Sequence, residues 1–221
     1  MAQIRIRYAV CAIPRVGSSY LCELLQNNGL GRPGEHFHVP IETPDNPTEE
    51  ALLEHRHRVE ARNTINGIMG TKLCATDWFR WRERYPATHL IRIRRMNLIE
   101  QAISHYIATY TNRWAAVSSQ PVPDKPVPFN ADMIAFYYQQ IRQQTQLWDQ
   151  ELATRSHLTI QYETLCDDPE GTLRQIFDYL GLPHPAAFHL TTRRQKQRDD
   201  TQVQDWIARL QQCPTFTADL P

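Results

Sequence analysis

The sequence has no excess of charge of either sign and no apolar run long enough to cross a bilayer. Lys plus Arg and Asp plus Glu each number 24 in 221 residues, so the formal net charge is zero. This balance argues against a broad surface for nucleic acids or other polyanions, while a local basic pocket remains compatible with it. The first ten residues alternate charged and apolar side chains and lack a signal-peptide pattern. We therefore expect a cytoplasmic protein with no membrane span and no nucleic-acid partner.

The sequence also lacks any closely spaced pair of cysteines. Its five cysteines are scattered along the chain, with no CxxC motif. An odd and scattered set predicts free thiols rather than a disulfide framework or a zinc site. Cys11 follows an apolar run and Cys22 lies in an apolar helical pattern, so both are expected in the core. No compact cluster of aspartate and histidine is present, and we expect no metal cofactor.

Short apolar runs alternate with amphipathic patterns along the whole chain. The composition, 41% hydrophobic and 22% charged, is typical of a globular protein, and the length suits a single domain over residues 1–221. Strands are predicted at 4–13, 67–73, 89–93 and 158–162, and helices at 18–28, 51–63, from 97, at 129–152, from 168 and around 203–210. Strands that alternate with helices predict an α/β fold of three layers, a P-loop-like central parallel sheet flanked by helices.

The loop between the first predicted strand and helix has the character of an anion site. Backbone N–H groups at the start of a helix, together with the helix dipole, favour a phosphate or sulfate. Gly17 permits a tight turn, Ser18 and Ser19 can donate hydroxyl bonds, and Arg15 adds a full positive charge. The loop is not a Walker A motif, because no GxxxxGK is present and the basic residue precedes the glycine.

The segment Pro14-Arg15-x-Gly17-Ser18-Ser19 resembles the 5′-phosphosulfate loop of sulfotransferases that use 3′-phosphoadenosine-5′-phosphosulfate (PAPS). Many members have lysine where this chain has arginine. Further matches follow in order: Leu21 to Leu25, Gly31-Arg32-Pro33-x-Glu35-x-Phe37, Gly70 to Leu73, Arg94-Arg95 with Gln101 to Ser104, Thr111 to Trp114, Tyr162 to Leu165, Asp168-Pro169 and Leu180 to Leu182. The combination is similar to the trehalose 2-sulfotransferase-like family.

This resemblance implies residues for the donor, PAPS, and its product 3′-phosphoadenosine 5′-phosphate. The loop from Pro14 to Ser19 would bind the 5′-phosphosulfate, with Arg15 neutralising the leaving phosphate. The 3′-phosphate would bind Ser104 and either Arg94 or Arg95, because a guanidinium fork suits a phosphate. Of these two arginines, Arg94 is slightly favoured. Gln195 and Arg198, in a late basic segment, resemble the part of the family pattern that closes over the cofactor.

The resemblance also implies residues for the acceptor. In the trehalose-sulfotransferase branch a glutamate of the Arg-Pro-x-Glu stretch is the proposed general base, and Glu35 is the matching residue here. A carboxylate can take the proton that an alcohol loses as it attacks sulfur. Many other sulfotransferases use histidine, so His36 and His38 stay as competing candidates. Lys72 and His38 are candidates for contacting the acceptor.

Two other readings make different predictions. A P-loop-like nucleotide kinase requires lysine after the loop glycine and acidic magnesium ligands at a strand end, whereas the third predicted strand ends in Arg94 and Arg95. A catalytically silent nucleotide-binding scaffold would have no need of Glu35. We therefore expect a sulfotransferase that acts on a hydroxyl of a small-molecule acceptor, a carbohydrate or another natural product. The same resemblance makes a homodimer plausible.

Overall fold

The computed structural model describes residues 3–38, 48–114, 126–191 and 200–213. The strands are β1 Ile6–Ala12, β2 Ile68–Cys74, β3 His89–Arg94 and β4 Leu158–Gln161. The helices are α1 Ser18–Asn27, α2 Glu49–Asn63, α3 Ala75–Trp81, α4 Leu98–Thr111, α5 Ala131–Leu152, α6 Tyr162–Asp167, α7 Pro169–Tyr179 and α8 Asp200–Gln211.

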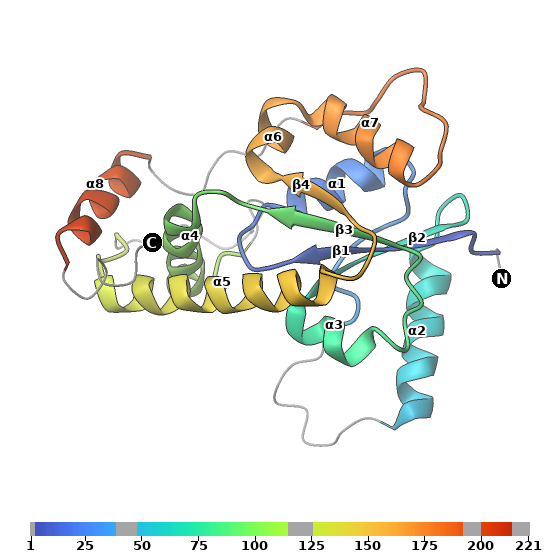
Figure 1. Cartoon of the computed structure of the whole chain (residues 1–221), viewed down its shortest axis with the longest axis horizontal. Coiled ribbons are helices and arrows are strands. Elements are labelled where there is room, and N and C mark those ends of the chain that lie inside the picture. The colour runs from blue at the N-terminus through green and yellow to red at the C-terminus, as the bar shows by residue number, and fades with distance from the viewer. Residues whose placement is uncertain (1–2, 39–47, 115–125, 192–199, 214–221) are drawn as a thin grey trace.

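The four strands form one parallel sheet in the order β2-β1-β3-β4. Figure 1 shows α1, α6 and α7 over one face of the sheet and α2, α3 and α5 over the other, so the predicted three-layer α/β fold is confirmed. Strand β1 is central, and its last five residues are fully buried. Such a strand reads as a continuous apolar run because both of its faces are covered.

Local signals fix the helix starts that position the site. Asn97 caps α4, with its side-chain oxygen accepting from the Glu100 N–H at 2.9 Å. Asp168 caps α7 and is followed by a proline at the first helical position, as expected. The long helix α5 is tied to the sheet by Trp148, whose indole N–H donates to the Ala12 carbonyl at 2.9 Å. Its predicted start at 129 was two residues early, since Asn130 is the cap.

Two helices were not predicted from the sequence, and each of them begins immediately after a strand. Helix α3 begins at Ala75, immediately after β2, and its cap residue Cys74 makes no side-chain cap bond. Helix α6 has only six residues and begins at Tyr162, which the sequence pattern assigned to the preceding strand. Neither helix carries a capping residue or an amphipathic period long enough to mark it. The expected core placement of two thiols is confirmed, because Cys11 and Cys22 are both buried.

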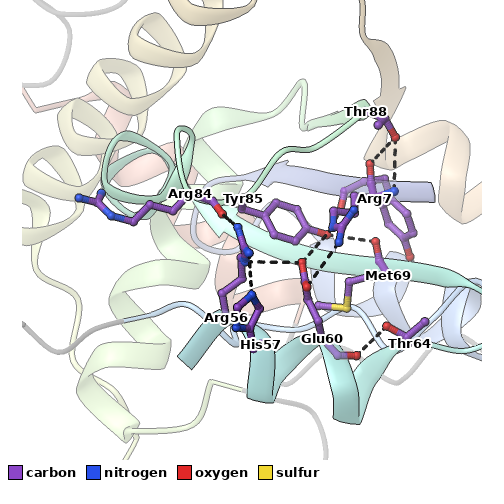
Figure 2. A network of polar contacts seen from close by, with 10 residues as sticks. Arg7, Arg56, His57, Glu60, Thr64, Met69, Arg84, Tyr85 and Thr88 are labelled. Atoms are coloured by element: carbon purple, nitrogen blue, oxygen red, sulfur yellow. Dashed lines mark hydrogen bonds and ion pairs between the residues drawn. The ribbon is translucent and has the colours of Figure 1, made fainter. Parts of the chain in front are cut away.

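The far end of the sheet from the loop is closed by a network around Glu60 (Figure 2). This carboxylate is 7% exposed and lies 2.9 Å from Arg7 Nε of β1 and 3.9 Å from Arg56 Nε of α2. Arg56 also donates to the Arg84 carbonyl at 2.7 Å. A buried carboxylate is tolerated only when it is paired in this way. The network therefore ties α2 to the sheet.

Candidate functional site

The loop that follows β1 has the conformation of an anion-binding nest. Arg15 and Gly17, two residues apart, both have positive φ angles, of 63° and 96°. Alternation of this kind turns successive backbone N–H groups toward one concave side. Gly17 is the cap residue of α1, and it has no side chain with which to satisfy the first amides of the helix. These amides are therefore available to a bound anion.

Gly17 is required here for a reason that the sequence did not reveal. A Cβ atom at this position would lie 2.1 Å from the ring of Tyr162, the first residue of α6. The positive φ is a second constraint, because residues with a side chain rarely adopt it. The loop, α1 and α6 therefore pack together at a point where only glycine fits.

Arg15 reaches from the loop to α4 and contacts a second predicted phosphate ligand. Its Nε donates to the Ser104 hydroxyl at 3.1 Å. Its Nη1 donates to the carbonyl of Trp114, beyond the end of α4. Two residues that the sequence proposed separately thus share one hydrogen bond.

The two arginines at the end of β3 point in different directions. Arg95 has a side chain only 8% exposed, and its Nη1 approaches the Arg15 carbonyl at 3.5 Å. Its Nη2 pairs with Glu100 at 2.8 Å, and its guanidinium lies 5.0 Å from the centre of the Tyr162 ring. Arg94 is 47% exposed and faces Asp149 of α5 at 3.6 Å. Arg95 is therefore the arginine beside the loop, although the sequence slightly favoured Arg94.

The other predicted loop residues lie at the same edge of the sheet. The carbonyl of Pro14 accepts from the side-chain amide of Gln101, a buried residue of α4, at 2.7 Å. Ser18 is 7% exposed at the start of α1. Ser19 lies next to Lys72, whose Nζ is 3.5 Å from the serine hydroxyl. The loop is thus fixed to α4 on one side and meets β2 on the other.

Lys72 connects this loop to the predicted general base. Its ammonium group is 2.9 Å from Glu35 Oε1. The lysine side chain is 12% exposed and the glutamate side chain 55% exposed, so Glu35 faces outward from a fixed cation. In the sheet register Lys72 pairs with Val10 of β1, which places it near the carboxyl end of β2. The structure therefore brings Glu35, Lys72 and Ser19 together.

The turn that carries Glu35 is held by hydrogen bonds to four consecutive carbonyls. The carbonyl of residue 34 accepts from the Lys72 N–H at 2.8 Å and from the Thr71 hydroxyl at 3.2 Å. The carbonyl of residue 35 accepts from the N–H of residue 38 at 3.3 Å. The carbonyl of residue 36 bonds His55 Nε2 of α2 at 2.8 Å. The carbonyl of residue 37 accepts from the Trp81 indole N–H of α3 at 2.9 Å. A stretch predicted only as a loop is therefore a rigid support built from β2, α2 and α3.

The two histidines beside Glu35 have different partners. His36 uses its Nε2 to bond the Arg32 carbonyl at 2.7 Å, which engages that nitrogen in holding the turn. His38 is largely exposed, and its Nδ1 lies 3.3 Å from Asp77 of α3. Burial raises the pKa of the Asp77 carboxyl, although the bond to His38 acts in the opposite direction. His36 is thus tied to the backbone, whereas His38 is paired with a carboxylate side chain.

Sequence analysis assigned no role to His105, which lies next to Ser104 on α4. Its ring packs 4.2 Å from the Tyr137 ring and 5.6 Å from the Trp114 ring, centre to centre. Burial, and in second place the charge of Arg15, lower the pKa of its imidazole to about 4. In the sequence His105 is one polar residue within an amphipathic helix, and no motif marks it.

The structure bears only in part on two predicted residues and on two predicted absences, a metal site and a membrane span. Gln195 and Arg198 lie outside the described residues. Within the described part of the chain, no group of three histidine, cysteine or acidic side chains could hold a metal ion. No helix among the described residues is long and apolar enough to cross a membrane.

The model of the "Sulfotransferase family" matches residues 79–186, slightly less than half of the chain. No curated protein matches the chain significantly.

Several solved structures resemble the chain. A sulfotransferase from Alicyclobacillus acidocaldarius aligns with a TM-score of 0.56 and 16% identity, over 98% of this chain and 97% of that one. The sulfotransferase domain of the Synechococcus PCC 7002 olefin synthase aligns with a TM-score of 0.55 and 15% identity, over 100% of this chain and 98% of that one. The sulfotransferase domain of the curacin biosynthetic pathway aligns with a TM-score of 0.51 and 14% identity, over 84% of this chain and 77% of that one. The chain therefore has the fold of the sulfotransferases, and the family match covers the elements from β3 to α7 within it.

Proposed function

We propose that this protein is a sulfotransferase that transfers the sulfuryl group of PAPS to a hydroxyl of a small-molecule acceptor. The single observation that carries the proposal is the contact between Arg15 and Ser104, at 3.1 Å. One comes from the loop after β1 and the other from α4, and both were predicted from sequence as ligands of the donor's phosphates. The two residues meet at the carboxyl edge of the sheet, and this is the edge at which open α/β sheets bind their ligands.

The residues at this edge suit an anionic nucleotide. Arg15 extends from the loop after β1, and the guanidinium of Arg95 approaches the Arg15 carbonyl, which brings two arginines to one loop. Ser104 and the amides at the start of α1 add uncharged donors. This donor set matches the polyanionic phosphates of PAPS. When bound, PAPS supplies a sulfuryl group activated by its anhydride bond to a phosphate.

On the donor side, the chain's role is positioning and charge stabilisation. Arg15 and the loop amides would hold the 5′-phosphate and stabilise the negative charge that develops there as the sulfur–oxygen bond breaks. Arg95 and Ser104 would hold the 3′-phosphate. Because Arg95 also pairs with Glu100, its guanidinium is already oriented.

On the acceptor side, Glu35 would take the proton of the attacking hydroxyl. The ion pair with Lys72 holds its carboxylate near the loop, because the same ammonium group also contacts Ser19. The four bonded carbonyls of the turn keep the backbone of Glu35 still, so little ordering is needed when the acceptor binds. A carbohydrate or another natural product with a free hydroxyl fits this role, because the chemistry needs only an alcohol and a base.

The test is calorimetric titration with 3′-phosphoadenosine 5′-phosphate, with ADP and with ATP plus magnesium as comparison ligands. We expect metal-independent binding that requires the 3′-phosphate. Ser104→Ala should weaken binding of the 3′-phosphorylated nucleotide about tenfold, since one hydrogen bond to a charged group is lost, and should leave ADP binding unchanged. A preference for ATP with magnesium, or equal losses for both nucleotides in Ser104→Ala, would overturn the proposal.

A further inference from the structure

His105 lies at the donor site without a role in the reaction outlined above. It directly follows Ser104 on α4, and its ring meets the edge of Trp114, whose carbonyl accepts from Arg15. The histidine is therefore part of the same unit as the two predicted phosphate ligands. Its neighbours come from the loop, from the end of α4 and from α5.

The ring is held firmly, but its hydrogen bonding is incomplete. Tyr137 of α5 packs on one side at 4.2 Å, with the two ring planes 33° apart. His105 Nδ1 is buried and has no hydrogen-bond partner among the described residues. A buried polar atom without a partner is costly, and such atoms in native proteins call for an explanation.

The charges around His105 all oppose its protonation. Arg15 is the charged group that acts on it from the loop, and Tyr137 is the titratable group from α5. No carboxylate within the described part of the chain forms an ion pair with the imidazole. With burial and a nearby cation acting in the same direction, the pKa of His105 falls to about 4. The ring is therefore neutral at pH 7 while no anion is bound.

We propose that His105 is a further residue of the donor site, and that it takes up a proton when the phosphates of the nucleotide bind beside Arg15 and Ser104. The inference rests on the proposed function, since the nucleotide supplies the anion. A phosphate bound by Arg15 replaces a net positive field at His105 with a negative one, which favours the charged ring. His105 would then add a second positive charge next to Arg15. A permanently charged residue at this position would be repelled by Arg15 whenever no nucleotide is bound.

This mechanism fixes the sign of the pH dependence. The protonated ring stabilises the complex, so its contribution grows as pH falls from the bound-state pKa toward the free-state value of about 4. Above the bound-state pKa the contribution disappears. The nucleotide phosphates also titrate near neutral pH, and the effect of His105 must be separated from theirs by comparing variants.

The test measures protons, not only affinity. The nucleotide 3′-phosphoadenosine 5′-phosphate is titrated calorimetrically at about pH 5.5 in two buffers of different ionisation enthalpy, which gives the number of protons taken up on binding. His105→Gln removes the titratable ring and keeps a polar side chain of similar reach. His89→Gln is the matched control, because His89 also has a pKa lowered by burial but lies at the opposite end of β3 from Arg94.

We expect the wild type and His89→Gln to take up the same number of protons, and His105→Gln to take up fewer by as much as about one. Equal uptake in wild type and His105→Gln, with binding retained, would overturn the role of His105 and leave the proposed function standing. Absence of nucleotide binding in the wild type would overturn both.

Histidine ring signals in NMR of the wild type give an answer that does not depend on the variant's folding. The signal that titrates near pH 4 in the free protein should shift to a higher pKa when the nucleotide is added. If it does not shift, the inference is wrong.

Discussion

The Nε of Arg15 and the hydroxyl of Ser104 lie 3.1 Å apart, although 89 positions separate the two residues in the chain. The bond crosses from the loop after β1 to the second turn of α4, next to the edge where β1 and β3 end. It makes the loop and α4 one structural unit. Changes in either residue should therefore affect the binding of the same nucleotide.

Replacement of Arg15 by alanine should reduce turnover by about 10²–10³-fold, because a charge aimed at the leaving phosphate is lost. Arg15→Lys should cost less, since it keeps the charge but loses the guanidinium fork. Steady-state kinetics with PAPS and an accepted alcohol would measure both. Arg58→Ala, which changes an exposed arginine of α2, is the control. Unchanged kinetics in both Arg15 variants would remove Arg15 from the donor site.

Glu35→Gln should retain nucleotide affinity and lose about 10²–10⁴-fold in turnover, the range typical of a lost general base. Lys72→Met should have a smaller effect on turnover, because it removes the cation that orients Glu35 but leaves the base in place. Calorimetry and kinetics on the same preparations separate the two effects. Near-normal turnover in Glu35→Gln would move the role to His38, which is more exposed than His36.

Gly17→Ala and Gly181→Ala compare a sterically blocked glycine with an open one. Both positions have positive φ, but a Cβ at Gly181 would meet no atom within 4 Å, whereas one at Gly17 would collide with Tyr162. Gly181→Ala should cost about 1–2 kcal/mol in the free energy of unfolding, from backbone strain alone. Gly17→Ala should cost more and should also abolish nucleotide binding. Urea unfolding and calorimetry measure the two properties, and equal behaviour of the variants would contradict the packing described for the loop.

Trp81→Phe and Trp78→Phe test whether the turn of Glu35 needs its support from α3. Both tryptophans are buried in that helix, but only the Trp81 indole bonds the turn, and Trp78 Nε1 has no hydrogen-bond partner among the described residues. Trp81→Phe should leave a buried carbonyl unsatisfied, at a cost of about 1–3 kcal/mol, and should lower kcat while nucleotide affinity is kept. Trp78→Phe should destabilise by packing loss alone. An equal fall in kcat in both variants would count against a positioning role for Trp81.

The folded state should lose stability in mild acid because of His105. Its pKa of about 4 lies below the usual value of 6.5, so the unfolded chain binds the proton more readily between these two values. Stability should therefore fall as pH decreases from 6.5 to 4, by about 2–3 kcal/mol for this group after allowance for its partial exposure. His105→Gln should remove that part of the acid limb in unfolding curves. His157→Gln, at an exposed position, should retain it, and parallel acid limbs in all three proteins would disprove the assignment.

The sequence predicted the elements whose signals are local and long. The apolar run of β1, the amphipathic stripe of α4 and the cap at Asp168 all appear in the structure where they were expected. Resemblance to a family supplied Arg15 and Ser104, which no local pattern would have paired. The sequence could not decide between Arg94 and Arg95, because β3 is covered on both faces and leaves no clean alternation from which to read the direction of a side chain.

The residues that were missed depend on contacts distant in sequence. His105 meets Trp114 because Asn112 ends α4 with a φ of 51° and so reverses the chain. Gly17 is constrained by Tyr162, which lies in a helix too short to be predicted. Neither relationship leaves a periodic signal in the sequence.

The support of the Glu35 turn also has a consequence for engineering of the protein. Four consecutive carbonyls are bonded by donors from β2, α2, α3 and the turn itself, so the proposed base is anchored by groups that lie outside residues 39–47. Substitutions within residues 39–47 should therefore leave Glu35 in place. Libraries that randomise residues 39–47 should thus contain a much lower proportion of inactive clones than libraries aimed at residues 34–37.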